Sequence, residues 1–178
     1  MVSNKIVRNT IGLPIEDSFQ IMTGIDDCNL LHEMRLEYGD TCRPKMAEKT
    51  HFYPDAIRFL KEMKDKNKIL GIVSTKERYS IQEALDKNKL TYLFDFIIGK
   101  SDVSEAKPSP EGILKASGML KRPVAELLYF GDSPVDGQAA MNAEVSFVAV
   151  LKGCHALENL KKYHPVLAIN KYDELLSV

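Results

Sequence analysis

The sequence is poor in cysteine, has no surplus of either charge and contains no long apolar run. The three cysteines, Cys28, Cys42 and Cys154, form no Cys-x-x-Cys pair. This argues against a disulfide framework or a zinc site and favours free thiols in a reducing cytoplasm. The net charge of −1 gives no support to nucleic-acid binding. No apolar run approaches the length that spans a membrane, so we expect no membrane partner.

Hydrophobic residues make up 44% and charged residues 28% of the 178 residues, which is the balance of a globular protein with a core. The pattern changes near residue 50. Residues 1–50 show helical spacing of apolar residues and no strand pattern, which predicts a small helical bundle. Residues 51–178 alternate apolar strands with amphipathic helices, which predicts βα units and a parallel sheet.

The boundaries of these elements follow from apolar spacing, glycine, proline and capping residues. In the first region we expect helices over 6–11 and 15–22, and a third helix that Asp26 or Asp27 caps and that ends before Gly39. In the second region we expect helices over 54–66, 80–88 and 110–117 and after Pro134, and strands over 69–74, 94–98, 127–130, 145–150 and 166–169.

Two carboxylates follow the apolar run at 127–130. Asp132 comes at the end of this expected strand, where open α/β sheets bind ligands. Asp136 follows four residues later, on the first turn of the next expected helix. Two nearby carboxylates make an oxygen-rich site for a hard cation such as Mg²⁺. The alternative is that Asp132 and Ser133 only cap the helix, which accounts for one acid and not for two.

Two further stretches carry groups that suit a phosphate. Ser74 and Thr75 place two hydroxyls at a strand end, beside the free amides of a helix start. The alternative is that these hydroxyls are helix caps. Lys107 precedes Pro-Ser-Pro, and the residue before proline is held in an extended conformation. A lysine fixed in this way can neutralise a phosphoryl group, although a surface lysine in a turn is the alternative.

In their order along the chain, the three stretches resemble the motifs of the haloacid dehalogenase superfamily of phosphohydrolases. The resemblance is strongest to the branch of phosphoglycolate phosphatases, which also includes pyrophosphatases and β-phosphoglucomutase. Ser74 matches the second motif of the family, and Lys107, within AKPSPEG, matches the third. Asp132 and Asp136, within GDSPVDGQAA, match the acidic fourth motif.

The resemblance implies an α/β fold, in which residues 51–178 form a Rossmann-like parallel sheet with helices on both faces. Residues 1–50 would then be a partial helical cap. Residues 11–19 are similar to the cap segment of the family, and residues 52–55 are similar to its return to the core.

The function that the resemblance implies is a Mg²⁺-dependent phosphatase, which hydrolyses a small phosphorylated metabolite through an aspartyl-phosphate. Asp136 would either bind the metal directly or orient Asp132 and its waters. The residues that the resemblance assigns are Lys107 and Ser74 for catalysis; Ser74, Thr75 and Lys107 for phosphate; Asp132 and Asp136 for the metal; and Gly131 and Ser133 beside the metal ligands.

One motif of the family is absent from this sequence. The first motif is an apolar strand that ends in Asp-x-Asp-x-Thr and carries the nucleophile, and no such run occurs here. By the resemblance this strand is the central one, between the strands at 69–74 and 127–130, so that both would have an unpaired edge. We therefore expect a truncated and inactive phosphatase, from a shortened gene product, a misplaced start codon or a truncated chain. We also expect a homodimer through the exposed edges. The alternative is a non-catalytic relative that binds phosphate or a partner.

Overall fold

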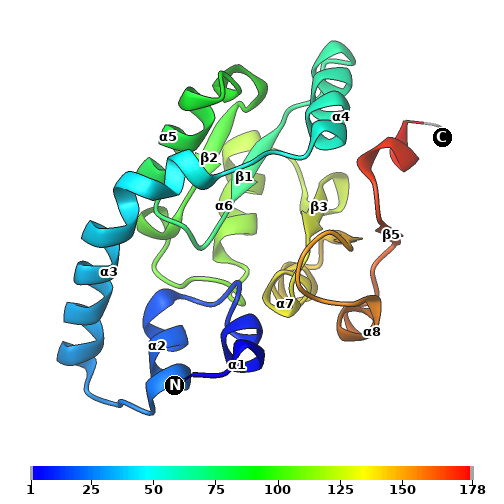
Figure 1. The fold of residues 1–178 in the computed structure, drawn as a ribbon. Coiled ribbons are helices and arrows are strands. Elements are labelled where there is room, and N and C mark those ends of the chain that lie inside the picture. Colours follow the sequence, from blue (N-terminus) through cyan, green and yellow to red (C-terminus); the bar gives the residue numbers. More distant parts are fainter. Residues whose placement is uncertain (1, 177–178) are drawn as a thin grey trace.

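The computed structural model describes residues 2–176, apart from the side chains at positions 43, 44, 46 and 47 (Figure 1). The helices are α1 (Asn4–Asn9), α2 (Ile15–Thr23), α3 (Cys28–Lys49), α4 (Pro54–Asp65), α5 (Arg78–Lys87), α6 (Glu111–Leu120), α7 (Pro134–Ala143) and α8 (Leu157–Leu160). The strands are β1 (Gly71–Val73), β2 (Phe96–Ile98), β3 (Leu128–Gly131), β4 (Ser146–Val150) and β5 (Leu167–Ile169). Short 3-10 helices are η1 (Thr91–Leu93), η2 (Lys100–Asp102), η3 (Val124–Glu126), η4 (Lys161–Tyr163) and η5 (Tyr172–Leu175).

The first region is helical, as its apolar spacing predicts. Gly24, at φ 73°, ends α2 in the left-handed conformation, and the side chain of Asp27 accepts the amides of Asn29 and Leu30 to cap α3. The prediction that this third helix ends before Gly39 is wrong, because α3 continues to Lys49. A single glycine inside a helix costs only about 1 kcal/mol, so it does not end a helix whose turns continue on both sides.

Every strand pair is parallel, which confirms the predicted α/β class. The strands form two separate sheets: β1 pairs with β2, and β3, β4 and β5 pair in that order. In the part of the chain that the structure describes, no strand lies between β1 and β3. A groove of about 510 Å³ lies there, and it is lined by both strands and by side chains of α4 and α6.

Helices cover both faces of the sheets, and each face has its own apolar core. Phe147 and Ala149 of β4 pack against the small residues of α7, whereas Val148 and Val150 point to the opposite face. This alternation is the two-residue period of a strand that is buried on both sides. None of the helices among the described residues is both long and apolar enough to cross a membrane.

Candidate active site

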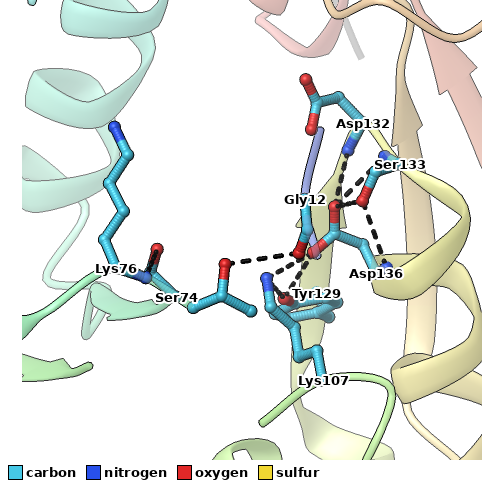
Figure 2. Close-up of polar contacts among 9 residues, drawn as sticks. Gly12, Ser74, Lys76, Lys107, Tyr129, Asp132, Ser133 and Asp136 are labelled. Atoms are coloured by element: carbon cyan, nitrogen blue, oxygen red, sulfur yellow. Dashed lines mark hydrogen bonds and ion pairs between the residues drawn. The ribbon is translucent and has the colours of Figure 1, made fainter. Parts of the chain in front are cut away.

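Lys107 and Asp136 form a buried ion pair at the centre of the predicted site. The Nζ atom of Lys107 lies 2.5 Å from Oδ1 of Asp136, and the two side chains are only 13% and 8% exposed. Nζ also donates to the hydroxyl of Tyr129 at 3.1 Å, and this hydroxyl donates to the same Oδ1 at 3.1 Å. Strand β3, helix α7 and the turn before α6 thus bring one lysine, one tyrosine and one carboxylate together (Figure 2).

These contacts keep both members of the pair charged. Burial works to lower the pKa of Lys107, but its contacts with Tyr129 and Asp136 raise it above its ordinary value. Burial works to raise the pKa of Asp136, but Lys107, Ser133 and Tyr129 hold it below its ordinary value. An ammonium at Lys107 and a carboxylate at Asp136 are therefore the states near neutral pH.

The second oxygen of Asp136 holds the start of α7. Its Oδ2 accepts the hydroxyl of Ser133 at 2.5 Å and the amides of Ser133 and Asp132 at 3.1 and 3.3 Å. The Ser133 hydroxyl in turn accepts the amide of Asp136 at 3.4 Å, which completes a capping box. Gly131 allows this close packing, because a Cβ atom there would lie 2.3 Å from Cβ of Asp136.

Asp132 has a different environment from Asp136. Among the described residues, no hydrogen bond from another residue and no ion pair reaches its carboxylate, whereas both oxygens of Asp136 are bonded to other residues. Burial, and then the nearby charge of Asp136, raise the pKa of Asp132. The backbone of Gly153 lies against this carboxylate, since a Cβ atom there would be 2.1 Å from Oδ2. Asp132 is therefore a partly buried carboxylate with free oxygens.

Ser74 and Thr75 lie across the site from these groups. The Ser74 hydroxyl accepts the amide of Lys76 at 3.2 Å within the turn that follows β1. This contact is not the helix cap of the alternative interpretation, because α5 begins at Arg78 and its N-cap residue, Glu77, makes no side-chain capping bond. The Thr75 hydroxyl donates to the carbonyl of Gly12 at 3.4 Å. Figure 2 shows Ser74 and Asp136 on opposite sides of Gly12, so the segment that leads into α2 lies between the end of β1 and Asp136.

The structure thus places every predicted site residue at the carboxyl ends of β1 and β3 or on the turn before α6. Sequence reasoning missed Tyr129, Gly12 and Gly153. Tyr129 belongs to the apolar run at 127–130. Its hydroxyl, three residues before Asp132, was the feature of the sequence that could have placed it in the site. Gly12 lies between the helices expected over 6–11 and 15–22 and carries no functional side chain. Gly153 carries no functional group, so only the fold shows that it touches Asp132.

Comparison with known proteins defines the family. The family model described as haloacid dehalogenase-like hydrolase matches residues 1–150. This chain belongs to that hydrolase family. The family and the α/β class that the three motifs predicted are therefore confirmed, and the roles of individual site residues stay predictions.

Several relatives of this hydrolase cover most of its length. Pyrophosphatase PpaX of Bacillus mycoides is 29% identical over 168 residues, which are 94% of this chain and 76% of that protein. Pyrophosphatase PpaX of Listeria welshimeri is 36% identical over 124 residues, which are 70% of this chain and 56% of that protein. A haloacid dehalogenase-like hydrolase from Bacteroides fragilis, known from its crystal structure, is 36% identical in sequence and superposes with a TM-score of 0.94. The superposition covers 98% of this chain and 83% of the other protein.

The oxygens at this site suit one magnesium ligand better than two. The described residues contain no group of three or more His, Cys, Asp or Glu side chains that could hold a metal ion. Asp132 offers a free carboxylate, and Mg²⁺ commonly binds one or two carboxylates while waters and phosphate oxygens complete its shell. Asp136 is fully bonded to other groups. Of the two roles open to Asp136, this geometry favours orientation of Asp132 over direct metal binding.

Proposed function

We propose that this hydrolase carries the phosphate- and Mg²⁺-binding residues of a phosphatase that acts on a small phosphorylated metabolite. The observation that carries this proposal is the group of side chains drawn together in Figure 2, namely the buried ammonium of Lys107, the carboxylate of Asp132 and the hydroxyl of Ser74. Thr75 directly follows Ser74 in the chain. An ammonium and hydroxyl donors bind phosphate oxygens, and a carboxylate holds a cation beside them.

Each of these residues has a role in the proposal. Lys107 donates to an oxygen of the transferred phosphoryl group, and Asp136 and Tyr129 fix the direction of its ammonium. Ser74 donates its hydroxyl proton to a second oxygen, and Thr75 adds its backbone amide. When bound, Mg²⁺ would neutralise charge on the phosphoryl oxygens. Asp132 would hold the ion, and Asp136 would fix the backbone of Asp132 through its amide.

The resemblance implies hydrolysis through an aspartyl-phosphate. A carboxylate attacks phosphorus and displaces the leaving group of the substrate, and water then cleaves the aspartyl-phosphate to release phosphate and the free carboxylate. The printed sequence contains no Asp-x-Asp-x-Thr motif to supply that carboxylate. Two relatives of this chain are named pyrophosphatases, so inorganic pyrophosphate is the first substrate to test, followed by small phosphate monoesters such as phosphoglycolate.

A second candidate function is binding of phosphate or of a partner without catalysis. The printed sequence favours it, because it contains no Asp-x-Asp-x-Thr motif to supply the nucleophile of the family. The unpaired edges of β1 and β3 support the homodimer that we predict, and sedimentation of the purified chain would show it.

Calorimetric titration of inorganic phosphate, with and without Mg²⁺, tests the proposal. We expect Mg²⁺ to tighten phosphate binding, and we expect Asp132→Asn to remove this gain. The loss of one contact to a charged group typically lowers a binding affinity about tenfold or more. Asp65→Asn, on the exposed end of α4, is the matched control and should keep the gain. Phosphate binding that ignores Mg²⁺ in the unmodified chain would contradict the proposal.

Turnover of p-nitrophenyl phosphate and pyrophosphate separates the two candidates. Mg²⁺-dependent turnover would show that this chain is itself a catalyst and would favour the phosphatase. Mg²⁺-dependent phosphate binding without turnover would favour the non-catalytic candidate for the chain on its own.

A further inference from the structure

Four residues hold the loop that follows β4, and we call them the Lys152 anchor: Tyr53, Asp55, Lys152 and Tyr172. The ammonium of Lys152 lies 2.7 Å from Oδ1 of Asp55, and the side chains are 18% and 10% exposed. The same ammonium lies 4.5 Å from the centre of the Tyr53 ring, and the Tyr53 hydroxyl donates to the carbonyl of Lys152 at 3.2 Å. Both the side chain and the main chain of Lys152 are therefore fixed to the start of α4.

The anchor is also fixed to the strand that carries the site. The second oxygen of Asp55 accepts the amide of Tyr172 at 2.9 Å. The Tyr172 ring packs with Phe59 and Phe130, with ring centres 5.8 and 6.3 Å away. Phe130 lies on β3, two residues before Asp132. The anchor thus joins α4, the β4 loop and η5 to the end of β3.

The loop that the anchor holds forms one wall of the space around the Asp132 carboxylate. Gly153 directly follows Lys152, and a Cβ atom at Gly153 would lie 2.1 Å from Oδ2 and 2.7 Å from Cγ of Asp132. No side chain fits between this backbone and the carboxylate. A shift of the loop by a fraction of an ångström therefore changes the space in which the free oxygens of Asp132 lie.

The charges around the anchor agree with this geometry. Burial raises the pKa of Tyr172 to about 12, and the charges of Asp132 and Asp55 add to this rise. The pKa of Asp55 lies below its ordinary value, chiefly because of its hydrogen bond from Lys152. The carboxylate that pairs with Lys152 is thus Asp55 and not Asp132.

We propose that Lys152 and Asp55 are positioning residues for cation binding, because they hold Gly153 against the carboxylate of Asp132. Neither residue contacts the phosphate site itself. The inference rests on the proposed function in one respect, which is that Asp132 is the cation ligand. Groups that orient a metal ligand typically change metal affinity about 10–100-fold when they are removed.

The test is the affinity of the full chain for Mg²⁺ alone, measured by calorimetry at a temperature where every variant is folded. We expect Lys152→Met and Asp55→Asn to weaken Mg²⁺ binding about tenfold or more. Lys152→Arg, which keeps the cation beside Asp55, should recover most of the affinity. The control is Lys64→Met, which breaks another ion pair of α4, at 2.8 Å to Asp95, before the start of β2.

A second measurement separates this inference from the proposed function. In nitrogen–proton NMR spectra without metal, Lys152→Met should move the amide signals of Asp132 and Gly153, and Lys64→Met should leave them in place. No Mg²⁺ binding by the unmodified chain would overturn the proposed function and the cation role together. Normal Mg²⁺ affinity in Lys152→Met and Asp55→Asn, or unmoved amide signals, would overturn the positioning role alone. If Lys152→Met does not fold, Asp55→Asn gives the same two results.

Discussion

The molecule contains two buried lysine–aspartate pairs that look alike and lie in different settings. Lys107 and Asp136 are 2.5 Å apart and lie among Tyr129, Ser133 and the end of β3. Lys152 and Asp55 are 2.7 Å apart and join the loop after β4 to α4. The first pair lies in the predicted phosphate site, whereas the second lies behind a residue of that site. In our proposals, the first pair contacts the phosphate and the second pair positions Asp132.

The energetic consequences of the two pairs differ in degree. Breaking a buried pair by removal of one partner leaves an unpaired buried charge, which costs about 3–5 kcal/mol. Asp136 has four further donors besides Lys107, namely the hydroxyls of Tyr129 and Ser133 and the amides of Ser133 and Asp132. Asp55 has one, the amide of Tyr172. The network around Asp136 is the larger one, so its loss should affect more of the structure.

The largest expected effect is that of Lys107→Met. The change leaves the Asp136 carboxylate buried without its cation, so we expect the free energy of unfolding to fall by about 3–5 kcal/mol. Urea denaturation followed by circular dichroism measures this loss. The double variant Lys107→Met/Asp136→Asn removes both charges and should recover part of the stability. A single variant as stable as the unmodified chain would contradict the buried pair.

Lys152→Met should lower the free energy of unfolding by less than Lys107→Met, and urea denaturation measures both losses. The Asp55 carboxylate keeps the amide of Tyr172 and a little solvent contact, so we expect a loss of about 2–3 kcal/mol. Lys152→Arg should lose much less. A loss for Lys152→Met that exceeds the loss for Lys107→Met would reverse the order of the two pairs.

The smallest expected effect is on how the free energy of unfolding depends on pH. The pKa values of Asp55 and Asp136 lie below the ordinary value in the folded state, so the unfolded chain binds more protons below about pH 4. Stability from these two groups is present above the unfolded pKa and is lost as the pH falls through the folded pKa. Asp136→Asn and Asp55→Asn should therefore flatten the acid limb of a plot of unfolding free energy against pH.

Ionisation of Asp132 should change the free energy of unfolding in the opposite direction. Its pKa is raised in the folded state, so its ionisation costs stability as the pH rises through that value. Asp132→Asn should therefore increase stability at neutral pH, where Asp136→Asn decreases it. Equal signs for the two variants would contradict the different environments of these neighbouring carboxylates.

Much of this architecture follows from sequence patterns. The order of strands and helices in residues 51–178 was predictable, because short apolar runs alternate there with longer amphipathic segments. The end of α3 was wrong, since one glycine does not decide a helix end. The residues Asp132, Asp136 and Lys107 were identified because charged groups stand out at strand ends and beside prolines.

Other features depend on contacts between distant parts of the chain. The sequence does not show that Asp136 is fully bonded and Asp132 is free, since both are acids of one motif. The contact between Gly153 and Asp132 and the pairing of Lys152 with Asp55 join residues far apart in sequence. Only the packing of β3, β4 and α4 brings these groups together.

The most direct test of the two roles is phosphate affinity in Lys107→Met and Lys152→Met, each measured with and without Mg²⁺. If Lys107 contacts phosphate, its loss should weaken binding about tenfold or more under both conditions, because a hydrogen bond from a charged group is worth about 1.5–3 kcal/mol. If Lys152 acts through Asp132, its loss should weaken binding only when Mg²⁺ is present. Equal behaviour of the two variants without Mg²⁺ would contradict the division between contact and position.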